Sequence, residues 1–88
     1  MLQHQFEIVN NLGLHARASA LFVKAATPFN SDVRLGLDGI EVNGKSIMGV
    51  MALAAAKGSK VHLSVEGPDE TTALQTIGKL IQEGFGEI

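Results

Sequence analysis

Four short stretches of this chain alternate apolar and polar side chains with a period of two, and this pattern restricts the fold more than any other feature. The side chains on the apolar side of the alternation are Leu2, His4, Phe6 and Ile8; Val33, Leu35 and Leu37; Ile40 and Val42; and Val61, Leu63 and Val65. Such alternation is typical of antiparallel strands that have one covered face and one solvated face. Asp38-Gly39, between the second and third stretches, predicts a tight hairpin.

Two longer stretches have apolar side chains at helical spacing. The first predicted helix starts near His15 or Ala16 and ends before Pro28, and the other opens at Pro68-Asp69 and ends at Gly84. Their apolar stripes are Ala18, Leu21, Phe22 and Ala25 in the first helix, and Leu74, Ile77, Leu80 and Ile81 in the other. A sheet with one apolar face needs a covering layer, and these two stripes are suited to form it.

Another helix is predicted over residues 47–57, with Ser46 as its N-cap and Gly58 as its C-terminal stop. Apolar side chains surround it on every side, and a domain this small rarely buries a helix on all sides. We therefore expect some of Ile47, Met48 and Met51 to face solvent or a partner protein, a role for which flexible methionines are well suited. Complete burial of this helix in the core is the alternative interpretation.

The order of elements is therefore β-α-β-β-α-β-α, an α+β class, and we expect residues 1–88 to form a single domain. A net charge of −2 and the absence of Trp and Tyr argue against nucleic-acid binding. The chain has no apolar run long enough for membrane insertion, no signal-peptide pattern at its start and no cysteine. We expect a cytoplasmic protein without a metal site or cofactor.

The segment Gly13-Leu14-His15-Ala16-Arg17 places an imidazole and a guanidinium at a predicted helix start. The first N–H groups of a helix lack intrahelical partners and the helix dipole is positive there, so an anion binds favourably. Arg17 adds a permanently charged fork that suits phosphate oxygens. This combination favours phosphate handling, while an exposed histidine without a special role is the alternative.

No Asp or Glu occurs between Glu7 and Asp32. The sequence therefore offers no nearby carboxylate that would orient His15 as a general base. On this ground we expect His15 to receive a phosphoryl group rather than to shuttle a proton, and a small hydrolase becomes an unfavoured alternative. A regulatory domain that binds a small anion at the helix start without a covalent bond remains the other alternative function.

Two motifs at this separation resemble those of the HPr family of histidine-containing phosphocarrier proteins. They are the run from Leu12 to Arg17 and the run from Val42 to Gly49, and the resemblance extends from the first strand to Phe85. It implies an open-faced β-sandwich, in which three helices cover one face of a four-stranded antiparallel sheet of order 1-4-2-3. It also implies a monomeric carrier with no catalytic turnover of its own.

The same resemblance implies the chemistry and the partners. His15 would accept a phosphoryl group on Nδ1 from enzyme I, which is charged by phosphoenolpyruvate, and would pass it to a IIA-type protein of the phosphotransferase system. Arg17 would hold the phosphate charge. Ser46 would be a regulatory phosphorylation site for HPr kinase/phosphorylase, as it is in some bacteria. Lys24 and the apolar helix at Ile47, Met48 and Met51 would contact partners, although a solvated surface also explains Lys24.

The sequence departs from the family pattern in two places: one affects how rigid the start of the first helix is, and the other affects which branch of the phosphotransferase system the protein would serve. Ala18 follows Arg17 where many members have proline, and this difference removes about 0.5–1 kcal/mol of local pre-organisation. The run Gly84-Phe85-Gly86-Glu87 resembles the nitrogen-branch paralogue, whereas the surroundings of Ser46 resemble the sugar-transport branch. The branch stays open at this stage. His4 and His62 lie in predicted strands and are expected to be structural or solvated.

Overall fold

Four strands form one antiparallel sheet whose spatial order differs from their order along the chain. The computed structural model describes residues 1–87, and its strands are β1 (Leu2–Glu7), β2 (Asp32–Leu37), β3 (Ile40–Asn43) and β4 (Lys60–Glu66). They lie in the order β1-β4-β2-β3, with each neighbouring pair antiparallel. At the hairpin between β2 and β3, Asp38 and Gly39 both have positive φ values, 52° and 83°. Two such residues in a tight turn match the twist of the strands, so the predicted hairpin is confirmed.

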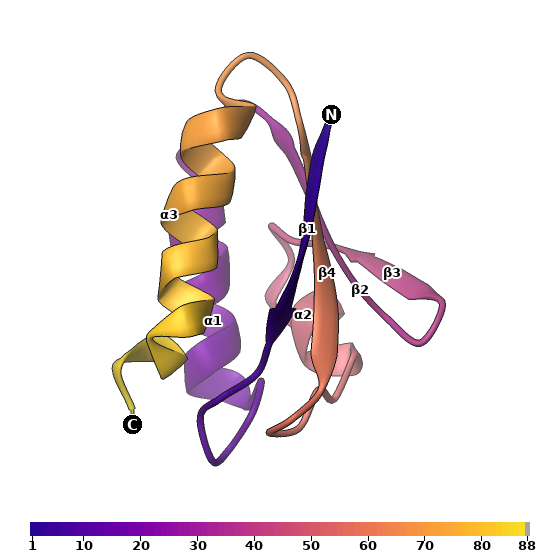
Figure 1. The fold of residues 1–88 in the computed structure, drawn as a ribbon, viewed down its shortest axis with the longest axis vertical. Coiled ribbons are helices and arrows are strands. Elements are labelled where there is room, and N and C mark those ends of the chain that lie inside the picture. Colours follow the sequence, from indigo (N-terminus) through magenta and orange to yellow (C-terminus); the bar gives the residue numbers. More distant parts are fainter. Residues whose placement is uncertain (88) are drawn as a thin grey trace.

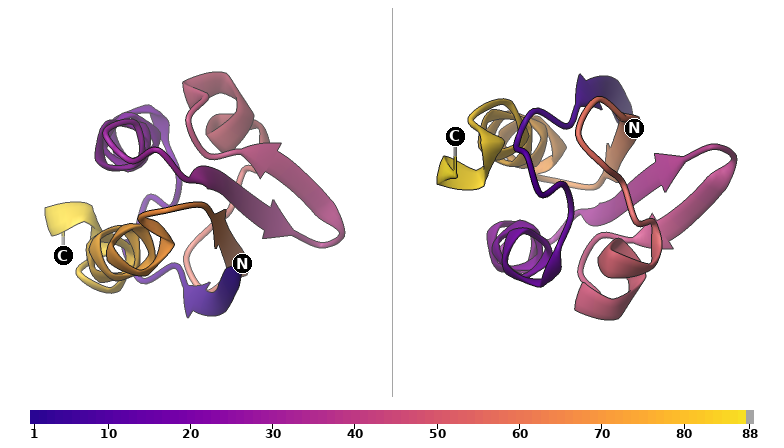
Figure 2. Two further views of the ribbon diagram at one scale, coloured as in Figure 1. Left: turned by 90° about the horizontal axis from the view of Figure 1, so that it is seen from above. Right: turned by 90° about the horizontal axis from the view of Figure 1, so that it is seen from below.

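Three helices cover one face of this sheet and leave the other face open (Figures 1 and 2). They are α1 (Ala16–Ala26), α2 (Ile47–Ala52) and α3 (Glu70–Gln82), and a short 3₁₀ turn, η1 (Gly84–Gly86), follows α3. The long helices α1 and α3 lie side by side, and α2 lies next to α1 over the half of the sheet that holds β3. The predicted element order, strand order and open-faced β-sandwich are confirmed. No helix within residues 1–87 is long and apolar enough to cross a membrane.

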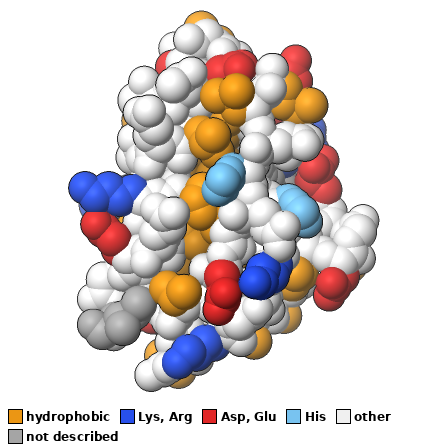
Figure 3. Space-filling model, viewed as in Figure 1, with side chains coloured by type: hydrophobic (Ala, Val, Ile, Leu, Met, Phe, Trp, Pro, Cys, Tyr) orange, Lys and Arg blue, Asp and Glu red, His pale blue; other side chains and the backbone are white. Residues whose placement is uncertain are grey.

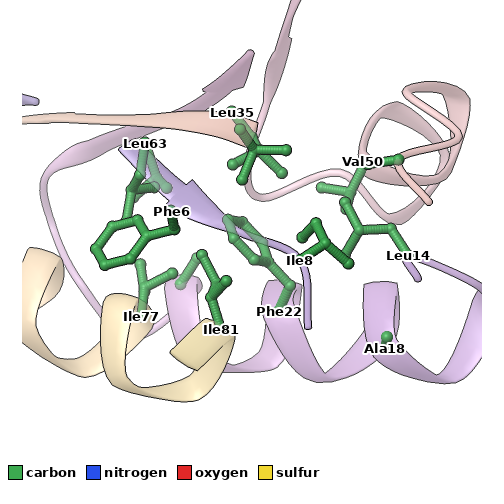
Figure 4. Packing of buried hydrophobic residues seen from close by; sticks show 14 of the residues in the cluster. Phe6, Ile8, Leu14, Ala18, Phe22, Leu35, Val50, Leu63, Ile77 and Ile81 are labelled. Carbon is green, nitrogen blue, oxygen red and sulfur yellow. The ribbon is translucent and has the colours of Figure 1, made fainter. Parts of the chain in front are cut away.

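The core lies between the sheet and the helices (Figure 4). Side chains from every layer contribute to it, and the largest ones without solvent contact include Phe22 from α1, Ile77 and Ile81 from α3, and Leu35 and Leu63 from the sheet. On α1 the buried stripe is Ala18, Ser19, Phe22 and Ala26, whereas Leu21 and Ala25 are only partly buried. The predicted stripe is therefore slightly displaced around the helix, because Ser19 can be buried by donating its hydroxyl to Leu14 O at 3.0 Å.

The prediction of a helix over residues 47–57 is wrong in length, since α2 ends at Ala52. After it the chain leaves the helical path through Ala54, which has a φ of 51°. This bend turns the carbonyl of Ala55 toward the loop before α1, where it accepts the N–H of Leu14 at 2.9 Å. Gly58 is not a helix stop; its N–H binds Ile8 O at 2.7 Å. Contacts with a distant loop therefore outweigh the helix propensity of the alanines.

The two strand histidines lie on opposite faces of the sheet. His4 is exposed in β1 with its ring 4.7 Å from that of Phe6, and His62 is exposed on the open face. His4 and Phe6 line a hollow between β1 and α3 together with Leu74 and Gly78. Apolar side chains are visible along this side of the molecule in Figure 3, where acidic and basic groups are interspersed around them.

Candidate functional site

His15 is the N-cap residue of α1. Its backbone is extended, with φ −71° and ψ −178°, and its Nδ1 accepts the N–H of Arg17 at 3.3 Å. The side chain is only 27% exposed. An N-cap side chain normally supplies an oxygen for one of the unpaired N–H groups of the first turn. Here an imidazole nitrogen takes that place, so an unprotonated Nδ1 faces the positive end of the helix.

The loop before His15 is fixed by its own hydrogen bonds and by the segment that follows α2. Gly13 has a φ of 64°, and its N–H binds Asn10 O at 3.1 Å, while Asn10 Nδ2 donates to Gly13 O at 2.9 Å. A Cβ on Gly13 would lie 2.3 Å from Ala55 O, so only glycine fits this close approach. Leu14 is buried and bonded to the same carbonyl. His15 therefore projects from a loop with little freedom.

A carboxylate reaches His15 from the far end of the chain. Oε2 of Glu87, in the segment after η1, lies 2.6 Å from His15 Nε2, and Oε1 accepts from Asn10 Nδ2 at 2.9 Å. The prediction that no carboxylate orients His15 is therefore wrong. It considered neighbours in sequence, whereas Glu87 is 72 residues away. The glycines at positions 84 and 86 signal a reversal of the chain after α3, and they could have drawn attention to Glu87.

The carboxyl group of Glu87 has its pKa lowered from 4.5. The hydrogen bond from Asn10 is the largest cause, the bond and charge of His15 and the charge of Arg17 lower it further, and desolvation opposes them. An ionised carboxylate only accepts hydrogen bonds, so Nε2 of His15 must donate. In the neutral ring Nδ1 then carries a lone pair, which agrees with its acceptance of the Arg17 N–H.

Arg17 is exposed in the first turn of α1 and lines a surface hollow. The other residues around this hollow include Asn11, Leu12, Phe85 and Glu87. No side-chain hydrogen bond or ion pair fixes the guanidinium within the described chain, so its fork remains available to an anion in the hollow. Among residues 1–87, no three His, Cys, Asp or Glu side chains gather to hold a metal ion.

Ser46 is the N-cap of α2, as predicted, and its Oγ accepts the N–H of Gly49 at 3.1 Å. Beside it, Lys45 Nζ donates to Phe29 O at 2.6 Å. Lys24 is exposed in the last turn of α1. The two predicted modification sites, His15 and Ser46, thus begin different helices.

The exposed side of α2 carries an apolar patch, which we define as Ile47, Met48 and Met51. Their exposed fractions are 44%, 83% and 41%, whereas Val50 on the opposite side is fully buried. Complete burial of this helix is thereby excluded, and the expectation that some of these side chains face solvent is confirmed. Leu12, in the loop before His15, is a further exposed apolar side chain at 71%.

Comparison with known proteins identifies the family. Residues 2–83 match the family model for the HPr component phosphorylation site of the phosphotransferase system (PTS). Phosphocarrier protein HPr of Treponema pallidum is 51% identical over 87 residues, covering 99% of both chains. The crystal structure of HPr-C-His from Thermoanaerobacter tengcongensis superposes with a TM-score of 0.96 at 45% identity, covering 100% of this chain and 99% of that one.

A second crystal structure, of an HPr dimer from Thermoanaerobacter tengcongensis, is also similar. It has a TM-score of 0.79 at 46% identity and covers 99% of this chain and 100% of that one. The match to the family model spans almost all of the sequence. The relatives are similar to this chain in sequence, and the solved structures are similar to it in both sequence and fold. The chain therefore belongs to the HPr family, the phosphocarrier proteins of the phosphotransferase system.

Proposed function

We propose that this protein accepts a phosphoryl group on Nδ1 of His15 from enzyme I, charged by phosphoenolpyruvate, and passes it to a IIA-type protein. The observation that carries the proposal is the N-cap position of His15, whose Nδ1 faces the start of α1 and carries a lone pair. A carboxylate–histidine pair also suits a general base. Membership of the phosphocarrier family and the position of Nδ1 favour the nucleophile.

The surroundings of Nδ1 suit a phosphoryl group. A phosphoryl group there would lie at the N-terminus of an eleven-residue helix, where backbone N–H groups and the helix dipole stabilise negative charge. The N–H of Arg17 could transfer its hydrogen bond from Nδ1 to a phosphate oxygen, and the exposed guanidinium could form a paired contact. His15 and Arg17 are thus the proposed transfer residues.

The apolar patch of α2 is the proposed docking surface for both partners. Exposed methionines adapt to surfaces of different shape, and a carrier must bind its donor and its acceptor in turn. Lys24 on α1 supplies a positive charge that a partner carboxylate could contact. Because each chain would hold one phosphoryl group covalently on His15 until it is passed on, the protein would act as a stoichiometric carrier and not as an enzyme with turnover of its own.

Ser46 is the proposed regulatory site. Its hydroxyl already lies at the helix start, and a phosphate there would add negative charge directly before the apolar patch. HPr kinase/phosphorylase is the proposed modifying enzyme. We further propose a monomer that acts in the cytoplasm, in sugar transport or in nitrogen-branch regulation. Sedimentation of the purified chain would test the monomer against the dimer known for a relative.

A transfer assay with purified enzyme I and phosphoenolpyruvate tests the proposal. The wild type should gain one acid-labile phosphoryl group per chain, His15→Ala should gain none, and His62→Ala should behave as the wild type because its imidazole is exposed on the open face. Phosphate uptake by His15→Ala would overturn the assignment. Reversible binding of free phosphate to the wild type, without covalent uptake, would support the anion-binding regulatory domain instead.

A further inference from the structure

We propose that Glu87 is a positioning residue that holds the proton on Nε2 of His15 and balances the charge of the ring when Nδ1 carries a phosphoryl group. The inference rests on the transfer chemistry proposed above and adds a residue to it. The carboxylate does not touch the nitrogen that reacts. It acts through the opposite side of the imidazole, where its Oε2 lies 2.6 Å from Nε2.

The backbone after α3 is folded to bring this carboxylate back to α1. Gly84, Phe85 and Gly86 have φ values of 64°, 57° and 76°, so three successive residues are left-handed. Glycine adopts this conformation without penalty, but for phenylalanine it costs about 1 kcal/mol or more. Burial of the Phe85 ring, which is only 4% exposed, offsets that cost and anchors the reversal. The packing of Phe85 therefore helps to determine the position of Glu87.

Asn10 holds the carboxylate from the other side. Its side chain is completely buried, and its Nδ2 donates both to Glu87 Oε1 and to Gly13 O, each at 2.9 Å. Both neighbours are acceptors, so the amide cannot be turned around without placing its oxygen against two other oxygens. Its own Oδ1 has no partner among the described residues. A buried amide thus gives up one hydrogen bond while it orients the carboxylate, an arrangement consistent with a functional role.

The charges around the pair favour an ionised Glu87. The hydrogen bond from Asn10 lowers the pKa of this carboxyl group most, and the bond and charge of His15 and the charge of Arg17 lower it further. An ionised carboxylate accepts from Nε2, and Nδ1 accepts from Arg17 N at 3.3 Å. Two separate contacts therefore select the same tautomer, with the proton on Nε2.

The chemistry of the transfer step depends on the proton that His15 carries on Nε2. The lone pair of Nδ1 attacks phosphorus, the new N–P bond forms as the bond to the donor breaks, and the electron pair of the broken bond stays with the donor. The ring keeps its Nε2 proton and becomes a phosphoimidazolium cation, whose charge Glu87 balances. In the onward transfer the N–P electron pair returns to Nδ1. Loss of the Nε2 proton would leave a neutral phosphoimidazole, which is a poorer leaving group.

A graded set of variants tests the proposal. Glu87→Gln keeps an acceptor but removes the charge, and Glu87→Leu removes both. Glu83→Gln is the control, since Glu83 is exposed and its carboxylate is paired with Lys79. Nitrogen-15 chemical shifts of His15 should show the Nε2-protonated tautomer in the wild type and in the control. In Glu87→Leu both tautomers should be populated, and amide exchange verifies that each variant remains folded.

Rates give the second measurement. Loss of a charge-assisted hydrogen bond should slow onward transfer about tenfold in Glu87→Leu, with an intermediate effect in Glu87→Gln and an unchanged KM for the acceptor. Wild-type shifts and rates in both Glu87 variants would overturn the role of Glu87 alone. A wild type that enzyme I does not phosphorylate would overturn the proposed function, whatever the shifts show.

Discussion

His15 and Ser46 hold the same position in two neighbouring helices, yet the two helix starts differ in how they are held. Each N-cap side chain accepts one backbone N–H, at 3.3 Å for His15 Nδ1 and 3.1 Å for Ser46 Oγ. His15 is in addition bonded by Glu87 and carried on a loop that packs against Ala55. Within residues 1–87 the side chain of Ser46 makes only the capping bond to Gly49, and the six-residue helix that follows it carries an exposed apolar patch.

The difference assigns different tasks to the two regions. Hydrogen bonds on both ring nitrogens and a tightly packed loop give His15 a fixed geometry, which a transfer step needs. A short helix with exposed methionines gives little geometric precision but a large adaptable surface, which docking needs. Changes near His15 should therefore lower kcat for transfer, while changes on α2 should raise KM for the partner proteins. The following experiments test this division.

The largest effect is expected for Gly13→Ala, which tests whether the geometry of the His15 loop is rigid. The new Cβ would lie 2.3 Å from Ala55 O at a residue with φ 64°. We expect a loss of about 2–3 kcal/mol in the free energy of unfolding and a lower kcat. Gly39→Ala is the matched control, because φ is 83° there but nothing lies within 4 Å of the new Cβ. It should lose only about 1 kcal/mol. Denaturant unfolding measures the free energy of unfolding of both variants. Equal losses would show that the loop rearranges to accommodate the new methyl group.

The next effect is expected on the apolar patch. Met48→Asp places a carboxylate where a partner must exclude water, and we expect KM for enzyme I to rise about tenfold or more with kcat unchanged. The fold should survive, because Met48 is 83% exposed. Ile40→Asp is the control, since Ile40 is 62% exposed but lies in the β2–β3 hairpin. An equal rise in KM for both variants would remove the argument for a docking surface on α2.

The division between the two regions also explains which features were predictable from sequence. The strands and the hairpin follow from period-two alternation and from Asp38-Gly39, which are local signals. The patch follows from an excess of apolar residues over what a small core can bury. Ser46 as a cap and His15 at a helix start follow from residue type and from the turn before them. These features depend on neighbours in the sequence.

The errors concern contacts between distant segments. The end of α2 is determined by the hydrogen bond between Leu14 N and Ala55 O, which no helix propensity reveals. Glu87 reaches His15 only because three left-handed residues reverse the chain after α3. Whether a glycine-rich ending turns back or continues outward depends on the burial of Phe85, and burial is a property of the folded molecule. For this reason the search for an acidic neighbour of His15 failed.

A smaller effect is expected for Arg17→Lys, which tests the precision of the His15 region. Lysine keeps the positive charge but loses the planar fork that pairs with two phosphate oxygens, so kcat should fall several-fold while KM stays unchanged. Arg34→Lys provides the control, because Arg34 is paired with Asp32 on the sheet at 3.0 Å, away from α1. Single-turnover transfer from phosphorylated enzyme I separates kcat from binding. Unchanged kcat in Arg17→Lys would mean that a point charge suffices.

The smallest effect is expected for the cap of α2, where stability and transfer should respond in opposite directions. Ser46→Ala loses the acceptor for Gly49 N and should lose about 1 kcal/mol of stability, with transfer unchanged. Ser46→Asp keeps an acceptor and adds a negative charge at the helix start, so its melting temperature should equal or slightly exceed that of the wild type. The same charge lies beside the patch and should repel an acidic partner surface, which raises KM for enzyme I. A melting curve and a transfer rate on one sample decide the point. If Ser46→Asp transfers like the wild type, or melts as early as Ser46→Ala, then Ser46 is a cap without a regulatory role.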